Sequence, residues 1–227
     1  MIAMVPQGFE SARGLKNVRD FIWDFDGTLY DTYSYTVPCF CAAVRAVGGT
    51  ADEAKVYELM MNSIPAAFKW YIEEQQLDSA LLYAEYKRIH RWDPVSQGGP
   101  FPYARELLRL ICQSGRRNFM FTHRTADVYE LMGYWETLEY FTDIVTLADG
   151  VAAKPSPQAI ELLAERNGMD KSRTVMVGDR EMDILSGANA GVLTCHVTNG
   201  KPYKDFDCDI RINSLREIYG ALGGKCV

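Results

Sequence analysis

The chain has 227 residues, of which 48% are hydrophobic, and its formal net charge is −6. This length and apolar content are enough for the core of one or two domains. The acidic balance argues against nucleic acid as the main partner. Because no run of about 18 apolar residues occurs, we expect no transmembrane helix and no membrane partner.

The six cysteines are scattered along the chain and form no C-x-x-C pair: Cys39, Cys41, Cys112, Cys195, Cys208 and Cys226. We therefore expect free thiols in a reducing compartment and a cytoplasmic protein. Residues 1–17 are expected to be a leader or tail. Their apolar start is too short for a secretory signal and has no basic region.

Short apolar runs rich in β-forming residues alternate with amphipathic patterns. The predicted strands are residues 20–25, 118–122, 143–147, 174–178 and 192–197, with a short edge strand at 209–213. The predicted helices between and after them are residues 103–114, 157–167, 181–190 and 214–219, the last capped by Ser214. This alternation predicts an α/β fold with a Rossmann-like parallel sheet, covered by helices on both faces in three α/β/α layers.

The interval between the first two strands is far longer than a crossover needs. Most of it has a helical pattern, over residues 37–47, 51–61, 64–75 and 79–92. We expect residues 34–97 to form an inserted helical cap domain, and residues 1–33 and 98–227 to form the core domain. An insert that begins beside a catalytic turn is placed to act as a lid.

Polar side chains gather where the predicted strands end. Asp24 and Asp26 lie at the end of the first strand, Thr122 ends the second, and Asp179 with Asp183 follows the fourth. Lys154 lies in Lys-Pro-Ser-Pro just before a helix. Ligands of open α/β sheets bind at this carboxyl edge. Carboxylates, a hydroxyl and a lysine at one edge match what phosphoryl transfer needs: a nucleophile, a site for a hard cation and donors to phosphate oxygens.

The ordered set Asp-Phe-Asp-Gly-Thr-Leu, a strand-ending Thr, Lys-Pro-x-Pro and Gly-Asp-x-x-x-Asp resembles the four motifs of the haloacid dehalogenase superfamily. The helical insert resembles the cap of its phosphoglycolate phosphatase and β-phosphoglucomutase branch. This resemblance implies that Asp24 is a nucleophile that forms an aspartyl-phosphate. It also implies that Asp26 protonates the leaving alcohol and then activates water.

The same resemblance implies the remaining site residues. Thr122 should donate to a phosphoryl oxygen, and Lys154 should neutralise the nucleophile and the phosphate. Mg²⁺ should be held by Asp24, the Asp26 main-chain carbonyl, Asp179 and Asp183. Gly27 and Thr28 should shape the turn, whose main-chain N–H groups can cradle the phosphate.

Two positions bear on the substrate. An acid such as Asp26 is what an alkoxide leaving group needs, whereas a halide needs no proton, so Asp26 favours phosphate esters. His123 and Arg124 depart from the family pattern, which more often has a small polar residue after the Thr. We expect His123 to narrow the pocket, contact substrate or bring a pH dependence near neutrality. Arg124 is expected to reach the substrate or cap a helix.

Other polar residues are weaker candidates. Lys87, Arg88, His90 and Arg91 form a basic cluster with Trp92 that fits a solvated helix face better than a ligand site. Tyr33 and Tyr35 fit pocket lining and core packing equally well. His196 ends a strand and is expected to be structural.

The sequence thus predicts a magnesium-dependent phosphatase, monomeric or weakly dimeric, that hydrolyses a small phosphorylated metabolite. Two alternatives remain open. A phosphomutase of the β-phosphoglucomutase type would use the same core, and a non-catalytic module would only bind a phosphate ligand.

Overall fold

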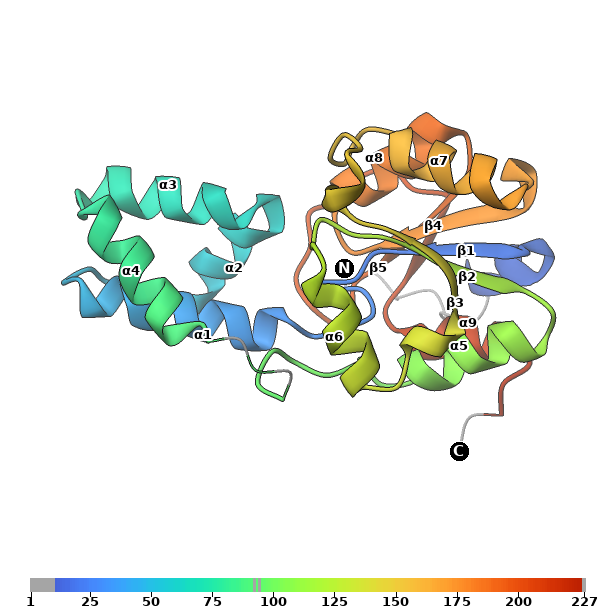
Figure 1. Cartoon of the computed structure of the whole chain (residues 1–227), viewed down its shortest axis with the longest axis horizontal. Coiled ribbons are helices and arrows are strands. Elements are labelled where there is room, and N and C mark those ends of the chain that lie inside the picture. The colour runs from blue at the N-terminus through green and yellow to red at the C-terminus, as the bar shows by residue number, and fades with distance from the viewer. Residues whose placement is uncertain (1–10, 92, 94, 226–227) are drawn as a thin grey trace, which may run out of the picture. The chain divides into compact units, whose positions relative to one another are not determined.

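The computed structural model of the protein describes residues 11–91, 93 and 95–225 and divides into two compact units (Figure 1). One unit, here called the core unit, contains the described residues up to 30 and from 100 onward. The other, the helical unit, spans residues 31–99.

The core unit is built on a six-stranded sheet in which every neighbouring pair is parallel. The spatial order of the strands is β3-β2-β1-β4-β5-β6, so the chain switches from one side of β1 to the other between β3 and β4. The strands are β1 (Asp20–Trp23), β2 (Arg117–Phe121), β3 (Phe141–Val145), β4 (Thr174–Gly178), β5 (Leu193–Val197) and β6 (Ile210–Ile212). A switch point of this kind beside the central strand is where open α/β sheets bind ligands.

Helices cover both faces of the sheet, as Figure 1 shows with α7 and α8 on one side and α5 and α9 on the other. The helices of this unit are α5 (Ala104–Gln113), α6 (Asp127–Tyr134), α7 (Gln158–Asn167), α8 (Glu181–Ala190) and α9 (Leu215–Ala221). Because successive strand residues point to opposite faces, Phe21 and Trp23 pack with α5 and α9, whereas Ile22 packs with α7. The strands are buried on both faces, and the predicted three-layer α/β fold is confirmed.

Several predicted boundaries were wrong by a few residues. The strand expected at 143–147 is β3, which starts and ends two residues earlier. It ends at Val145 because Thr146 caps the short 3-10 helix η3 (Leu147–Asp149): its hydroxyl accepts from the Ala148 N–H, and Asp149 accepts from the Thr146 N–H. The eight-residue helix α6 was not predicted, because so short an element shows little periodicity.

The expectation that residues 1–17 are a leader or tail is wrong for its described part. Residues 11–17 form the 3-10 helix η1 (Ser11–Asn17), in which Ala12 and Leu15 are fully buried in the same cluster as Ile210 and Leu215. Residues 1–10 lie outside the described residues. The apolar start of the chain therefore leads into a segment that is part of the core.

The helical unit contains α1 (Tyr33–Ala46), α2 (Glu53–Asn62), α3 (Ile64–Gln75) and α4 (Ser79–Ile89). Three of these helices have side-chain caps, because Asp52, Ser63 and Asp78 each accept a hydrogen bond from a main-chain N–H three residues on. Helix α1 starts a turn earlier than predicted and includes Pro38. Helix α4 ends at Ile89 rather than continuing to Trp92, which lies outside the described residues.

The described helices include none that is long and apolar enough to cross a membrane. The cysteines that the structure describes are all free thiols: Cys39, Cys41, Cys112, Cys195 and Cys208. Cys226 lies outside the described residues.

Candidate functional site

The chain turns sharply just after β1. The Asp24 N–H donates to the Val177 carbonyl (2.9 Å), which continues the pairing with β4 one residue beyond the strand. Gly27 has φ +80°, a conformation that other residues rarely adopt. Its N–H donates to the Tyr30 carbonyl (2.8 Å), so this N–H is used inside the turn rather than for a phosphate.

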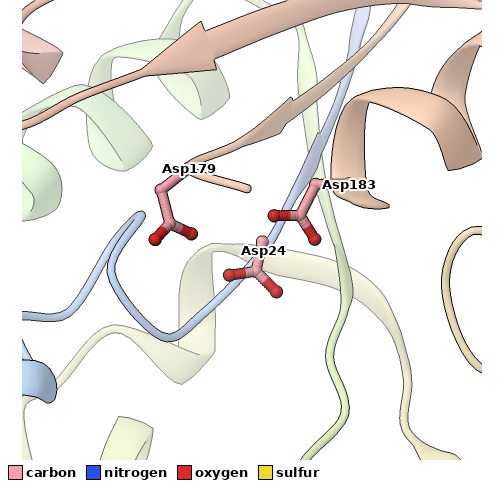
Figure 2. A group of neighbouring side chains, drawn as sticks. All are labelled: Asp24, Asp179 and Asp183. Carbon is pink, nitrogen blue, oxygen red and sulfur yellow. The ribbon is translucent and has the colours of Figure 1, made fainter. Parts of the chain in front are cut away.

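Three carboxylates meet at the carboxyl edge of the sheet, from the ends of β1 and β4 and the first turn of α8 (Figure 2). Asp24, Asp179 and Asp183 are all buried, and one oxygen from each lies within 4.8 Å of the others. The close approach of Asp183 depends on Gly178. A Cβ at position 178 would lie only 2.2 Å from the Asp183 Cβ.

Lys154 supplies a positive charge inside this group. Its side chain is fully buried, and its ammonium pairs with Asp24 and, at 2.8 Å, with Asp183 Oδ1. The Lys154 Nζ also lies 4.8 Å from the centre of the Phe121 ring. Lys154 and Asp24 are far apart in the sequence, and the fold brings them into contact just after β1.

Burial and mutual repulsion change the acidity of the carboxylates. Burial, together with repulsion from Asp183, raises the pKa of Asp24 to about 6 against the opposing effect of Lys154. Burial and the two neighbouring carboxylates raise the pKa of Asp179 well above its usual value. Burial also acts to raise the pKa of Asp183, but Lys154 and Arg180 outweigh it and hold that pKa low.

This donor set fits a hard divalent cation. Oxygen-only ligands from clustered carboxylates are what Mg²⁺ prefers, and a bound cation would relieve the repulsion that raises two of the three pKa values. The Thr28 hydroxyl lies 3.1 Å from Asp179 Oδ1, as donor, and 3.4 Å from Asp24 Oδ2. Thr28 therefore ties the turn after β1 to the carboxylate after β4.

Thr122 and His123 follow β2, and His123 contacts the Lys154 loop. The Thr122 hydroxyl oxygen accepts from the Arg124 N–H (3.1 Å), which leaves its proton for another acceptor. The His123 Nε2 accepts from the Lys154 N–H (2.9 Å), so the proton of a neutral ring is on Nδ1. Burial, with Lys154 and Arg180 nearby, lowers the pKa of His123 to about 4. This direction argues against one of the three roles predicted for His123, a pH dependence near neutrality.

Arg124 binds the second aspartate of the turn. Its Nε lies 3.0 Å from both Asp26 oxygens and its Nη2 lies 2.8 Å from Oδ1, while its Nη1 donates to Asp127 Oδ2 (2.6 Å). The guanidinium also stacks 5.1 Å from the Phe25 ring centre. We had predicted that Arg124 reaches the substrate or caps a helix. Its main partner, Asp26, was not predicted.

Asp26 lies apart from the three-carboxylate group. Its side chain is 27% exposed and is held by Arg124, whereas the clustered carboxylates are buried. The sequence assigned it to the metal site only through its main-chain carbonyl.

His196 is buried and supports Asp179. Its Nδ1 accepts from the Arg211 Nε (3.2 Å), so its Nε2 carries the proton and donates to the Asp179 main-chain carbonyl (3.1 Å). Burial, with Arg211 nearby, lowers the pKa of His196 to about 4, which keeps the ring neutral. Its role here is to hold the chain at the end of β4.

The weaker candidates of the helical unit have local partners. Tyr33 packs in the core of this unit, edge-on to Tyr57. The Tyr35 hydroxyl donates to the Arg91 carbonyl (3.2 Å). In the basic cluster, Lys87, Arg88 and Arg91 are exposed, and Arg88 pairs with Glu85 at 2.7 Å.

Two residues of the site were missed from the sequence. The Asn199 side-chain amide donates to the carbonyls of Gly27 (2.9 Å) and Thr28 (3.1 Å) and so fixes the turn after β1. Arg180 follows Asp179 directly and points its guanidinium toward Asp24 and Asp183. The signal for Arg180 was its place inside Gly-Asp-Arg-Glu-Met-Asp, whereas nothing local marks Asn199.

Comparison with known proteins agrees with this geometry. A family model described as "Haloacid dehalogenase-like hydrolase" matches residues 21–197. The chain is 25% identical to Pyrophosphatase PpaX of Halalkalibacterium halodurans, over 92% of this chain and 98% of that protein. It is 26% identical to Phosphoglycolate phosphatase of Vibrio parahaemolyticus, over 89% of this chain and 95% of the relative.

Among solved structures, a HAD family hydrolase from Deinococcus radiodurans R1, crystallised with phosphate and sodium, superposes with a TM-score of 0.76. The match covers 91% of this chain and 96% of that one, at 15% identity, so it supports the fold alone.

Proposed function

The chain belongs to the haloacid dehalogenase-like hydrolase family, and from this premise we propose that it is a magnesium-dependent phosphatase. Its substrate is a small phosphorylated metabolite, and the reaction runs through an aspartyl-phosphate on Asp24. Asp24, Asp26, Thr122 and Lys154 carry the reaction in this proposal.

The observation that carries the proposal is the pairing of Asp24 with Lys154 beside two further carboxylates. Asp24 is buried at the carboxyl end of the central strand, and one of its oxygens lies within 4.8 Å of oxygens of Asp179 and Asp183. A nucleophile for phosphorus has to be an anion that approaches another anion. Buried countercharges next to it are what such an approach requires.

In the first half of the reaction, a carboxylate oxygen of Asp24 attacks phosphorus and the bond to the leaving oxygen breaks. Lys154 and the Thr122 hydroxyl stabilise charge on the phosphoryl oxygens. Arg124 holds Asp26 as a carboxylate, so Asp26 first takes up a proton from water and then gives it to the leaving oxygen. A divalent cation held by Asp24, Asp179 and Asp183 would supply further neutralisation of phosphoryl charge when bound.

In the second half, water attacks the phosphorus of the aspartyl-phosphate. Asp26, now a carboxylate, takes a proton from this water, and the acyl-phosphate bond breaks to return Asp24 and release inorganic phosphate. Arg124 holds Asp26 by both oxygens, which fixes the direction of its carboxylate. One residue thereby serves both proton transfers.

The relatives suggest two substrate classes to examine first. One relative is named for pyrophosphate and another for phosphoglycolate, that is, for a phosphoanhydride and for the phosphate ester of a small hydroxy acid. We include both classes in the proposal, together with a cytoplasmic location.

A phosphate-release screen over phosphorylated metabolites, with inorganic pyrophosphate included, tests this function. We expect release with at least one compound, dependent on added Mg²⁺ and abolished in Asp24→Asn. Failure of the folded, metal-supplied protein to release phosphate from a broad panel would contradict the proposal. Isomerisation of a sugar phosphate without release would favour the phosphomutase instead.

A further inference from the structure

Arg180 lies inside the candidate site although no motif assigns it a role. It sits between β4 and α8, and its main-chain N–H donates to Asp183 Oδ2 (2.9 Å). Its side chain is only 11% exposed. The Nη2 lies 4.0 Å from Asp24 Oδ1, and the Nε lies 3.8 Å from Asp183 Oδ2. The guanidinium is therefore a second buried cation beside the carboxylate that follows β1, in addition to Lys154.

This position brings Arg180 within reach of any phosphoryl group that Asp24 attacks. An attacking oxygen has to come within about 3–3.5 Å of phosphorus. The phosphoryl oxygens are bonded to that phosphorus, so an oxygen on the Arg180 side of Asp24 comes within reach of a guanidinium that is 4.0 Å from Asp24. The planar, multidentate donor set of arginine suits phosphate oxygens better than the single point charge of a lysine.

We propose that Arg180 binds the transferred phosphoryl group together with Lys154, and that its charge weakens the hold of the three carboxylates on a divalent cation. This inference rests on the proposed phosphatase function. It adds Arg180 to the residues that bind phosphate. It also proposes that Arg180 strengthens the binding of phosphate and weakens the binding of the cation.

The opposite effect follows from the charges around the site. Asp24, Asp179 and Asp183 attract a cation, and Lys154 alone would leave two of the three negative charges unbalanced. Arg180 balances one more of these negative charges. A bound phosphate pairs with the guanidinium, and its negative charge offsets the repulsion between Arg180 and the cation. Phosphate and cation should therefore each strengthen the binding of the other.

Binding measurements on metal-free protein test this without turnover. We would titrate the wild type, Arg180→Ala and Arg180→Lys with Mg²⁺ alone, and then with inorganic phosphate at saturating Mg²⁺, by calorimetry. Arg109→Ala, which removes an exposed arginine of α5, is the matched control for loss of one positive charge. Circular dichroism checks that each variant is folded.

For Arg180→Ala we expect Mg²⁺ to bind about tenfold more tightly and phosphate about tenfold or more weakly. Arg180→Lys should keep the Mg²⁺ affinity of the wild type and bind phosphate with intermediate affinity. Arg109→Ala should change neither affinity by more than about twofold. Opposite shifts in one folded variant are a result that general damage to the site would not produce.

Unchanged phosphate affinity in Arg180→Ala, or weaker binding of both ligands, would overturn the inference and leave the phosphatase proposal standing. If the wild type binds no phosphate even with Mg²⁺, the inference and the proposed function both fail.

Discussion

The Arg124 guanidinium binds the Asp26 carboxylate through three hydrogen bonds, two from Nε at 3.0 Å and one from Nη2 at 2.8 Å. Asp127 holds the other end of the guanidinium, and the Phe25 ring lies beneath it. This arrangement fixes the direction of a carboxylate that is not itself buried. In the proposed reaction, Arg124 is a positioning residue for the acid and base Asp26.

Arg124→Ala should lower kcat by about 10-fold to 100-fold, because Asp26 would no longer be held in one orientation. Steady-state kinetics on a phosphate ester identified in the screen measure this effect. KM should change little, because Arg124 is engaged with Asp26 and Asp127 rather than with substrate.

Two further variants separate this role from general damage. Arg124→Lys keeps the charge but loses the paired N–H donors of the guanidinium, so it should recover only part of kcat. The double variant Arg124→Ala with Asp26→Asn should be no slower than Asp26→Asn alone. Additive losses would show that Arg124 acts independently of Asp26.

Gly178 allows the metal-site carboxylates to converge. Gly178→Ala would place a Cβ 2.2 Å from the Asp183 Cβ, so either the strand end or Asp183 has to move. We expect weaker Mg²⁺ binding by calorimetry and a loss of about 1–3 kcal/mol in the free energy of unfolding.

Gly133 in α6 provides the matched control. A Cβ there meets nothing within 4 Å, and its backbone is helical. Gly133→Ala should leave Mg²⁺ binding unchanged and leave stability equal or raised by up to about 1 kcal/mol. Equal Mg²⁺ affinity in Gly178→Ala and Gly133→Ala would refute the role given to Gly178.

His123 makes the folded state less stable in mild acid. Burial, with Lys154 and Arg180, lowers the pKa of His123 in the folded state from 6.5 to about 4. Between these pH values His123 is protonated in the unfolded chain and neutral in the folded chain. Stability is full above the unfolded pKa and is lost as the pH falls from about 6.5 toward 4. Between pH 7.5 and 5.5, the wild type should lose about 1 kcal/mol more than His123→Gln.

Chemical denaturation at the two pH values measures this difference. The other titrating groups, Asp24 and Asp179 among them, are present in both proteins and largely cancel in the comparison. A pH dependence of stability that is the same in both proteins would mean that His123 is protonated in the folded state.

The parallel sheet could be predicted because its central strands, β1 and β4, are fully buried and form short apolar runs. Residues 174–178 were predicted with the bounds that β4 has in the structure. The prediction failed where local hydrogen bonds or packing against distant residues decide the structure. β3 ends early because Thr146 and Asp149 cap a 3-10 helix, and η1 was missed because burial of Leu15 depends on distant residues such as Leu215.

The residue types of the site were readable because Asp24, Asp179 and Asp183 follow strand ends in recognisable motifs. The partners of the charged side chains were not readable. The Arg124–Asp26 contact joins residues 98 positions apart, and Asn199 reaches the Gly27 carbonyl from 172 positions away. Pairings of this kind depend on side-chain directions that only the folded chain defines.

In the proposed reaction, Asp24 becomes phosphorylated during turnover. Rapid quench of the Mg²⁺-supplied enzyme with p-nitrophenyl phosphate, borohydride reduction and mass spectrometry of the peptide that contains residue 24 test it directly. We expect reduction of the Asp24 side chain to homoserine in the wild type and no such product in Asp24→Asn, which should also release no phosphate. Turnover without a trapped product at position 24, together with phosphate release by Asp24→Asn at the wild-type rate, would contradict it.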